Sequence, residues 1–377
     1  MKYYIIAGEA SGDLHAANLM KEIRARDEHA EFRCWGGDKM QGQGGNLMKH
    51  YRDLAFMGFL EVALNIRKII GNLDFCRKDI MVWRPDAVIL VDYPGFNLRI
   101  AEFCHKQGIK VFYYISPQVW AWKKSRIKNI VRDVDRLFVI LPFEKKFYKE
   151  YHYDVDFVGH PLLDALDGSH EKNDSVAFRT KHRLDDRKII ALLPGSRKQE
   201  ISKILPIMLQ AMTHFPDFQA VVAGMTVNEP ALYEKYSDGH PLKVIYNSTY
   251  DLLQNCDAAA VTSGTASLEA ALLNVPQVIC YKGSPISFAI ARRIVNVKYI
   301  GLPNLVLDRE IVTELIQNDL SPENLKENIH KLLYDQDVRS HLADDYELLK
   351  KKLGGPGASA RTAELILHYL KSAVKHT

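Results

Sequence analysis

The sequence predicts an α/β protein with two parallel β-sheets, one in each of two domains. The chain has 377 residues, more than one hydrophobic core usually serves, and it is 47% hydrophobic and 25% charged, as ordinary globular proteins are. Short apolar runs rich in β-branched and aromatic residues alternate with longer amphipathic stretches, as in repeated βαβ units. Turns rich in glycine and polar residues follow these runs, at the strand ends where open α/β sheets bind their ligands.

The expected strands form two series along the chain. In the first half they are Tyr3–Ala7, Ala87–Val91, Val111–Ile115, Arg136–Ile140 and Asp156–Val158. In the second half they are Ile189–Leu193, Gln219–Ala223, Lys243–Tyr246, Ala258–Val261 and Gln277–Tyr281. A polar stretch at 164–187 separates the series and is typical of a linker between domains. The sequence therefore predicts one domain at 1–166 and a second at 167–353.

A glycine-rich break at 353–357 ends the second domain. It stops a helix, and Ala358–Ser372 then has apolar residues at helical spacing. We expect the segment 354–377 to form a helix that packs back on the first domain, either its own or that of a partner. Monomer and homodimer both stay open.

Charge and cysteine content narrow the functional classes. The 50 basic and 46 acidic residues give a net charge of +4, too mild to predict nucleic acid as the main partner. The five cysteines include no Cys-x-x-Cys pair, and no His-rich cluster has zinc spacing, so we expect reduced thiols and no cofactor. The apolar run at the N-terminus is shorter than that of a signal peptide, and no run approaches the roughly 18 to 20 residues of a membrane span. We expect a cytoplasmic protein that at most touches a membrane surface.

The first strand leads into the turn GEASGD, at 8–13. Its small residues let backbone amides approach a ligand, and the helix that begins there favours an anionic or oxygen-rich group. Ser11, Gly12 and Asp13 are therefore candidate substrate-binding residues. The spacing is not that of the G-x-G-x-x-G dinucleotide fingerprint, which argues against NAD. An ordinary strand-to-helix turn would have the same pattern.

Asp92 follows the second expected strand and precedes a Pro-Gly turn. A carboxylate that is held and partly desolvated there suits a general base that removes a proton from an acceptor hydroxyl. Alternatively, Asp92 only caps the next helix.

Further on, the motif SPQVWAW at 116–122 places two tryptophans beside a turn. This pattern suits contacts to sugars or acyl chains, but it also suits a hydrophobic core.

The second half carries the stronger signal for a phosphate. LPGSR at 193–197 follows a buried strand and ends in Arg197, a natural bidentate partner for a phosphate that Glu200 can hold in place. Gly195 and Ser196 complete this turn as candidate binding residues. A surface ion pair between Arg197 and Glu200 is the alternative.

The turn TSGTASLE, at 262–269, combines small hydroxylated residues with glycine at the start of a helix. Free amides and hydroxyls at such a helix N-terminus bind a diphosphate. The candidates are Ser263, Gly264, Thr265, Ala266 and Ser267. Glu269, in the first turn of the helix, can accept two hydrogen bonds from a ribose diol or simply suit the helix dipole. No D-x-D cluster or His/Glu set stands near these turns, so we expect no metal.

In their order along the chain, these motifs closely resemble the lipid-A-disaccharide synthases. The resemblance covers nearly the whole chain and rests on GEASGD (8–13), DYPGFN (92–97), SPQVWAW (116–122), GHP (159–161), LPGSR (193–197), SGTASLE (263–269) and PNL (303–305). It implies two Rossmann-like domains facing across a cleft, the glycosyltransferase B fold. It also implies a metal-independent, inverting enzyme peripheral to the cytoplasmic face of the inner membrane. That enzyme joins UDP-2,3-diacylglucosamine to 2,3-diacylglucosamine 1-phosphate, giving a β-1′,6-linked disaccharide and UDP.

The resemblance assigns roles to residues at matching positions. Asp92 matches the family's proposed catalytic base, and Glu9, Ser11, Arg197 and Asn304 match residues of its active cleft. Glu269 matches the ribose-binding glutamate of the wider superfamily. Many relatives have Ala-Pro-Asp-Phe-Asn after the base where this chain has Tyr-Pro-Gly-Phe-Asn, so no role of that second aspartate transfers.

Acylated substrates require a surface that reaches a membrane. The stretch from Phe56–Leu60 to Val82 and Trp83 mixes large apolar residues with Arg67, Lys68, Arg77 and Lys78, as does the run Trp120–Lys128. Such patterns fit an interfacial helix that meets anionic lipid, or an ordinary helix that covers a sheet.

Two rival functions stay open on the same fold. One is a non-hydrolysing UDP-N-acetylglucosamine 2-epimerase, and the other is a non-catalytic UDP-sugar-binding protein at the membrane surface.

Overall fold

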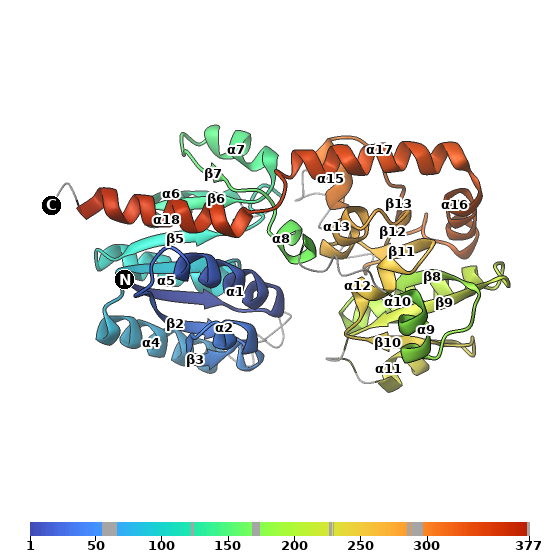
Figure 1. Cartoon of the computed structure of the whole chain (residues 1–377), viewed down its shortest axis with the longest axis horizontal. Helices are drawn as coiled ribbons and strands as arrows, with labels where there is room; N and C mark the ends of the chain where they lie inside the picture. The colour runs from blue at the N-terminus through green and yellow to red at the C-terminus, as the bar shows by residue number, and fades with distance from the viewer. Residues whose placement is uncertain are drawn as a thin grey trace. The chain divides into compact units, whose positions relative to one another are not determined.

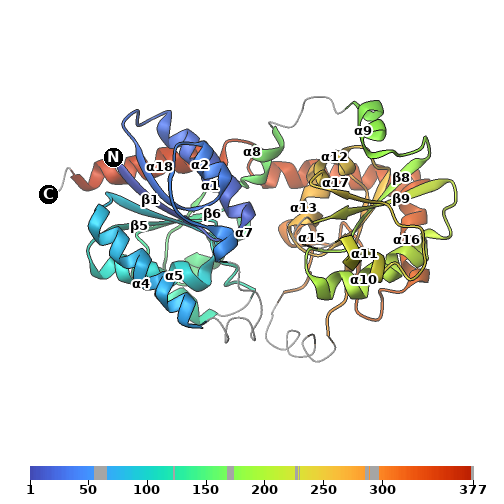
Figure 2. The same cartoon turned by 90° about the horizontal axis from the view of Figure 1, so that it is seen from below.

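A computed structural model describes residues 1–54, 66–121, 124–167, 174–225, 228, 230–284, 288 and 297–374. The chain divides into two compact units, Met1–Asp167 with Leu353–Thr377 (unit 1) and Gly168–Lys352 (unit 2). Each unit contains one parallel β-sheet with helices on both faces (Figures 1 and 2). The predicted α/β fold class with two sheets is confirmed.

The sheet of unit 1 has seven strands in the order β3-β2-β1-β4-β5-β6-β7. They are β1 (Lys2–Ala7), β2 (Glu31–Gly36), β3 (Asn46–His50), β4 (Ala87–Val91), β5 (Lys110–Tyr114), β6 (Arg136–Val139) and β7 (Asp156–Phe157). The five strands predicted in this half are present, whereas β2 and β3 were not predicted. Their sequences EFRCWG and NLMKH carry charged and polar residues and lack the continuous apolar run of a buried strand.

Helices cover both faces of this sheet. They are α1 (Ala10–Arg24), α2 (Asp38–Gly42), α4 (Ile66–Trp83), α5 (Pro94–Lys106), α6 (Ile127–Asp133), α7 (Pro142–Lys149), α8 (Leu162–Asp167) and α18 (Ala358–Val374). Alternate strand residues belong to different cores, as the two-residue period of a strand requires. Tyr4 and Ile6 pack in the same core as Cys76 of α4, whereas Tyr3 and Ile5 pack in the core that contains residues of α1 and α18.

The sheet of unit 2 has six strands in the order β10-β9-β8-β11-β12-β13. They are β8 (Lys188–Leu193), β9 (Phe218–Gly224), β10 (Val244–Tyr246), β11 (Ala258–Thr262), β12 (Gln277–Tyr281) and β13 (Glu314–Ile316). Its helices are α9 (Ser175–His182), α10 (Lys198–Met212), α11 (Pro230–Lys235), α12 (Thr249–Gln254), α13 (Thr265–Leu272), α15 (Leu302–Leu307), α16 (Pro322–Tyr334) and α17 (Gln336–Lys352). The five strands predicted in this half are present, and among the strands described here the short edge strand β13 alone was not predicted.

The last helix, α18, completes the core of unit 1. Ala363, Ile366, Leu367 and Leu370 are buried against α1 and the sheet. Full burial of one such aliphatic side chain contributes roughly 1.5–3 kcal/mol. The helix therefore belongs to the hydrophobic core of this unit, although it lies far from the other elements of the unit in the sequence (Figure 1).

Polar contacts fix the start of α18. The carboxylate of Asp164, on α8, accepts hydrogen bonds from the backbone N–H groups of Gly357 (2.6 Å), Ala358 (3.1 Å) and Ser359 (2.8 Å). These are donors that a helix N-terminus leaves without an internal partner. Gly159 of the GHP motif has φ +85°, and a Cβ there would lie 2.6 Å from the Arg361 guanidinium. The GHP motif thus has a structural role, because it gives room to the chain that enters α18.

Replacing Asp164 by alanine removes all three contacts. We expect the free energy of unfolding to fall by about 1–2 kcal/mol, the usual effect of losing a helix cap. Urea denaturation measures it. Glu364→Ala, which removes an exposed carboxylate of α18 itself, is the matched control and should change stability by less than about 0.5 kcal/mol. Equal effects of the two substitutions would contradict the capping role.

Candidate active site

Asp92 stands at the carboxyl end of β4 in a tightly fixed backbone. Asp92 (φ +46°) and Tyr93 (φ +51°) both adopt the left-handed conformation, which is uncommon for residues other than glycine. The Asp92 N–H donates to the carbonyl of Tyr114 (3.1 Å). The Asp92 carbonyl accepts from the Tyr113 hydroxyl (2.6 Å) and from Nδ2 of Asn97 (2.7 Å). These bonds use the main chain of Asp92 and leave its carboxylate for other contacts.

Backbone strain is concentrated around this residue. Ile115, directly after β5, has φ +65°, an outlier for a β-branched residue. Each such residue costs on the order of 1–3 kcal/mol and persists only where the surroundings impose it, which is common at functional sites. Gly8 is required by the same arrangement, because a Cβ there would lie 2.3 Å from the ring of Tyr93.

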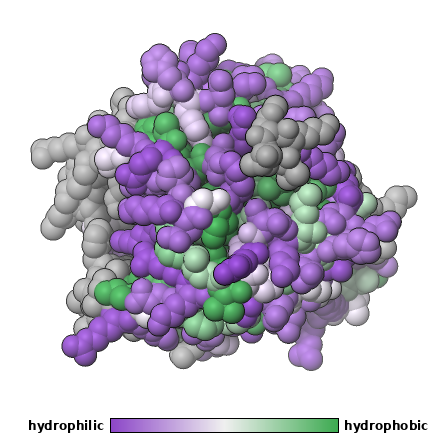
Figure 3. Space-filling model, turned by 90° about the vertical axis from the view of Figure 1, so that its left-hand side faces the viewer, coloured by the Kyte–Doolittle hydropathy of each residue, from purple (hydrophilic) through white to green (hydrophobic). Residues whose placement is uncertain are grey.

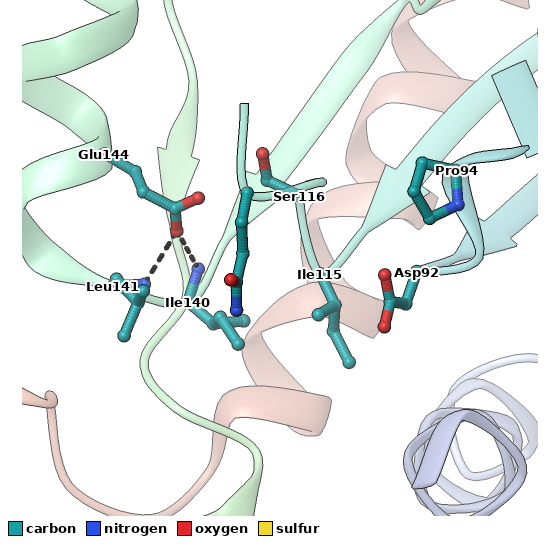
Figure 4. A pocket seen from close by; sticks show the side chains of 8 residues that line it. Asp92, Pro94, Ile115, Ser116, Ile140, Leu141 and Glu144 are labelled. Carbon is teal, nitrogen blue, oxygen red and sulfur yellow. Dashed lines mark hydrogen bonds between the residues drawn. The ribbon is translucent and has the colours of Figure 1, made fainter. Parts of the chain in front are cut away.

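A pocket opens beside Asp92 at the ends of three successive strands (Figure 4). Its volume is about 210 Å³. The described residues that line it are Asp92, Pro94, Ile115, Ser116, Gln118, Ile140, Leu141 and Glu144. Ser116 and Gln118 belong to the SPQVWAW motif, so the structure places the start of that motif in the same pocket as Asp92. Trp122 lies outside the described residues.

Both carboxyl groups of the pocket have raised pKa values. Burial, with a smaller contribution from the charge of Glu9, raises the pKa of Asp92 to about 6. A carboxylate with such a pKa is mostly ionised at neutral pH and still basic enough to accept a proton. Burial also raises the pKa of Glu144 to about 7. Oε2 of Glu144 accepts hydrogen bonds from the N–H groups of Ile140 (3.2 Å) and Leu141 (2.9 Å).

The first turn divides into exposed and buried residues. Glu9 and Ser11 are exposed, and the charge of Glu9 acts on Asp92 because β1 and β4 are adjacent, with Ala7 paired to Val91. Gly12 is buried, and a Cβ there would meet that of Ala7 at 3.2 Å, so its lack of a side chain lets α1 pack closely on β1.

Asp13 was predicted to bind substrate, which stays a prediction, and in the structure its side chain is engaged within the protein. Asp13 is only 3% exposed, and its carboxylate accepts hydrogen bonds from the backbone N–H groups of Gly37 (2.7 Å), Lys39 (3.1 Å) and Met40 (3.1 Å). It therefore fixes the start of α2. Its residue type and its place in the motif gave no sign of this, because β2 and α2 were not predicted.

In unit 2 the two predicted phosphate turns leave the sheet side by side. β8 and β11 are adjacent parallel strands, with Leu193 paired to Val261, so the turns after them lie at the same edge. Oε2 of Glu200 accepts from the backbone N–H of Arg197 (3.2 Å) at the start of α10. The Arg197 side chain is 70% exposed and lies 3.7 Å from Glu200, which leaves its guanidinium accessible to a ligand.

Glycine has a defined role in each of these turns. Gly195 has φ +106°, and a Cβ there would lie 2.4 Å from Oε2 of Glu200. Gly264, with φ +143°, precedes α13 and provides no side-chain cap, so the first amides of that helix stay open to a ligand. Ser196, Gly264 and Thr265 are exposed, and Ala266 is half-buried.

The serines of the second turn are mostly engaged by the protein. The hydroxyl of Ser263 donates to the carbonyl of Ile300 (2.8 Å) and keeps its lone pairs for a ligand. Ser267 is fully buried, and its hydroxyl donates to the carbonyl of Gly264 (2.8 Å). That hydroxyl closes the first turn of α13, and the substrate-binding role of Ser267 stays a prediction.

Glu269 has a partner that the sequence did not reveal. The hydroxyl of Tyr250, on α12, donates to Oε1 of Glu269 (3.0 Å) and leaves Oε2 for another donor. Burial raises the pKa of Glu269. In the sequence, a tyrosine at the start of a short helix is too unspecific a feature to predict that Tyr250 binds Glu269.

Asn304 was predicted in the active cleft, which stays a prediction, and in the structure its side-chain amide binds groups within the protein. It is fully buried on α15, and Nδ2 donates to the carbonyl of Val312 and to Oε1 of Glu314, both at 2.8 Å. Oδ1 accepts from the N–H groups of Ile311 (2.8 Å) and Val312 (2.9 Å). All hydrogen-bonding positions of the amide are thus filled, so Asn304 positions Glu314, which in turn accepts from the N–H of Gly301.

Among the described residues, no group of three or more His, Cys, Asp or Glu side chains is placed to hold a metal ion. The five cysteines are free thiols, and burial raises the pKa of each, for example that of Cys34 to about 12.

The fold and these strand-end turns define the class of protein. Solved structures with the same fold include a UDP-GlcNAc 2-epimerase from Neisseria meningitidis bound to UDP-GlcNAc (TM-score 0.69, 14% identity, 98% of this chain and 100% of that chain). They also include the glycotransferase of kitacinnamycin (TM-score 0.66, 14% identity, 98% and 99%). At such identities the likeness establishes the fold alone, which is that of glycosyltransferase B proteins and these epimerases.

The particular family follows from sequence comparison. The family model described as lipid-A-disaccharide synthetase matches residues 3–367. Proteins named lipid-A-disaccharide synthase are 39% identical in Syntrophus aciditrophicus (98% of each chain) and 38% identical in Geobacter sulfurreducens (98% of this chain, 97% of that one). One in Coxiella burnetii is 35% identical over 96% of each chain. The chain belongs to the lipid-A-disaccharide synthetase family.

If Asn304 positions Glu314, replacing Asn304 should lower the stability of the folded protein. In Asn304→Asp a carboxylate would face both Glu314 and the carbonyl of Val312, and we expect destabilisation on the order of 3 kcal/mol. Chemical denaturation measures this. Asn328→Asp on α16, whose amide bonds at the surface, is the control and should stay within about 0.5 kcal/mol. If Asn304→Asp is as stable as the wild type, the structural role is contradicted and substrate binding by Asn304 is favoured.

The raised pKa of Asp92 has a cost in stability. Because the folded-state pKa of about 6 exceeds the unfolded value of 3.8, the folded state loses stability through this group as the pH rises from about 4 to about 6, and the loss is complete above that range. We expect Asp92→Asn to be more stable than the wild type at pH 8, by up to about 3 kcal/mol, and no different at pH 4. Urea titrations at the two pH values measure this, and a pH-independent difference would contradict it.

Proposed function

We propose that this chain joins UDP-2,3-diacylglucosamine to 2,3-diacylglucosamine 1-phosphate, giving a β-1′,6-linked disaccharide and UDP. Family membership supports this reaction. The observation that carries it is the carboxylate of Asp92, which is fixed at a strand end, opens onto a pocket and has a pKa of about 6. A base with these properties suits the removal of a proton from an acceptor hydroxyl near neutral pH.

The reaction proceeds by one displacement at the anomeric carbon of the donor. Asp92 accepts the proton of the acceptor 6-hydroxyl, the oxygen forms the new bond to the anomeric carbon, and the bond to UDP breaks with its electron pair on the phosphate. A single displacement inverts the configuration. Asn97 and Tyr113 act as positioning residues, because they hold the main chain of Asp92.

The donor's diphosphate is bound by unit 2 in this proposal. The exposed guanidinium of Arg197 and the uncapped amides at the start of α13 stabilise the charge that develops on the leaving phosphate. Glu269, held by Tyr250, accepts hydrogen bonds from the ribose diol. Because these groups already supply positive charge, the proposal needs no metal ion.

The epimerase alternative is not favoured. Epimerases share the fold at about 14% identity, whereas the synthases share 35–39% identity over nearly the full length. An epimerase would also convert the donor alone, without an acceptor. A non-catalytic UDP-sugar-binding protein would have no use for a carboxylate whose burial destabilises the fold.

We further propose contact with the cytoplasmic face of the inner membrane through α4. Ile70, Phe75, Met81 and Val82 are exposed on this helix, and basic residues accompany them. The side of the molecule that Figure 3 shows is mostly hydrophilic, with hydrophobic residues in small separate patches (Figure 3). The predicted segment Phe56–Leu60 lies outside the described residues. Among the helices that are described, none is long and apolar enough to cross a membrane.

Mass spectrometry of UDP and disaccharide, formed from the two diacylglucosamine substrates, tests the reaction. We expect both products in equal amounts, and a fall in turnover of at least about 10² for Asp92→Asn. Near-normal turnover in Asp92→Asn would contradict the role of Asp92 as the base. Formation of an isomerised UDP-sugar when no acceptor is present would show that the enzyme is an epimerase instead.

Flotation with vesicles that contain anionic lipid tests the membrane surface. Replacing Arg67 and Lys68 by glutamate reverses two charges on α4, and we expect the bound fraction to fall several-fold, since each basic residue near such a surface contributes about 1 kcal/mol. Lys351 and Lys352, replaced in the same way, are the control with the same change in net charge. Equal binding of both double variants would refute this surface.

A further inference from the structure

The pocket beside Asp92 has a polarity that restricts what enters it. Asp92 and Glu144 stand at opposite sides, with Ile115 and Ser116 between them (Figure 4). None of its described lining residues carries a positive charge. A phosphate would meet one or two carboxylates and no cation, so the pocket is unfavourable for it. Neutral hydroxyl groups, by contrast, can donate to carboxylate oxygens.

Its size sets a second limit. The volume of about 210 Å³ is below the roughly 300–1,000 Å³ of pockets that enclose drug-sized ligands. Part of one sugar ring fits, whereas two acyl chains do not. Ile115, Ile140 and Leu141 provide apolar wall against which the C–H groups of a sugar can pack.

The chemistry of the acceptor then fixes its orientation. The hydroxyl that Asp92 deprotonates is on carbon 6, and the 4-hydroxyl is its neighbour on the same edge of a pyranose. Carbon 1, which carries the phosphate, is across the ring from carbon 4. An acceptor whose 6-hydroxyl reaches Asp92 can thus insert its uncharged edge and keep its phosphate outside.

We propose that this pocket is the subsite for the 4,6-hydroxyl edge of the acceptor glucosamine and that Gln118 determines specificity by binding the 4-hydroxyl. The inference rests on the proposed function, since it takes its acceptor from there. The 1-phosphate and acyl chains lie outside the pocket.

Gln118 is singled out by elimination among the polar lining residues. The hydroxyl of Ser116 is shared with Tyr148 (2.8 Å) and with the carbonyl of Pro117 (3.1 Å). Glu144 uses Oε2 for two backbone N–H groups. Within the described part of the chain, the exposed side chain of Gln118 makes no hydrogen bond, so its amide is available to both donate to and accept from a hydroxyl.

Saturation-transfer NMR on the full chain with soluble glucosamine 1-phosphate tests the orientation without turnover. We expect the strongest transfer to the protons on carbons 4 and 6 and the weakest to that on carbon 1, with a marked loss in Gln118→Leu. Gln41→Leu, at an exposed glutamine of α2, is the control and should keep the wild-type pattern. Strongest transfer to the carbon 1 proton, or no transfer at millimolar ligand, would overturn the proposal.

A kinetic comparison tests the role of Gln118. With a 4-deoxy acceptor, we expect kcat/KM of the wild type to fall about fivefold to tenfold, the effect of one lost hydrogen bond. Gln118→Leu should lose about as much with the natural acceptor and show no further loss with the 4-deoxy acceptor. Equal losses with both acceptors would overturn the specificity role. Failure of the reaction itself is distinguishable, because the wild type would then form no disaccharide while the NMR pattern still reports the subsite.

Discussion

The candidate active site depends on the way the main chain of Asp92 is held. Two consecutive residues in the left-handed conformation turn the chain sharply after β4, and the side chains of Asn97 and Tyr113 bind the Asp92 carbonyl that this turn exposes. Gly8 has no side chain because the ring of Tyr93 occupies that space. Since the main chain is fixed from several directions, the carboxylate stays half-buried beside the pocket at a cost in stability, which a purely structural residue would not require.

The two units have the same arrangement of parallel strands and strand-end turns, but these turns carry different functional groups. In each, two adjacent parallel strands end beside one another and their turns meet at one edge of the sheet. Unit 1 places the carboxyl groups of Glu9 and Asp92 there, and burial raises the pKa of Asp92 to about 6, so that it can accept a proton near neutral pH. Unit 2 places a guanidinium and uncapped amides there, which suit a phosphate. The acidic edge and the electropositive edge thus correspond to the two needs of a glycosyl transfer.

Much of this was predictable from the sequence, and the exceptions have physical causes. Strands buried on both faces, such as β4 and β11, are continuous apolar runs and were found. The strands β2, β3 and β13 were missed because they lie toward sheet edges and carry polar residues or are very short. Motif positions were informative about the site, but residue type did not distinguish ligand contacts from internal caps. Asp13, Ser267 and Asn304 all bind backbone groups that only the three-dimensional structure brings to them.

The pH dependence of kcat/KM for the acceptor tests the central claim, that Asp92 is a base tuned by burial and by Glu9. We predict that activity rises with pH with an apparent pKa near 6, since the base must be ionised. In Glu9→Gln the loss of a neighbouring negative charge should move this limb to lower pH, whatever the effect on the maximal rate. An acidic limb near pH 4, the ordinary value for an aspartate, or a limb that Glu9→Gln leaves in place, would contradict the account.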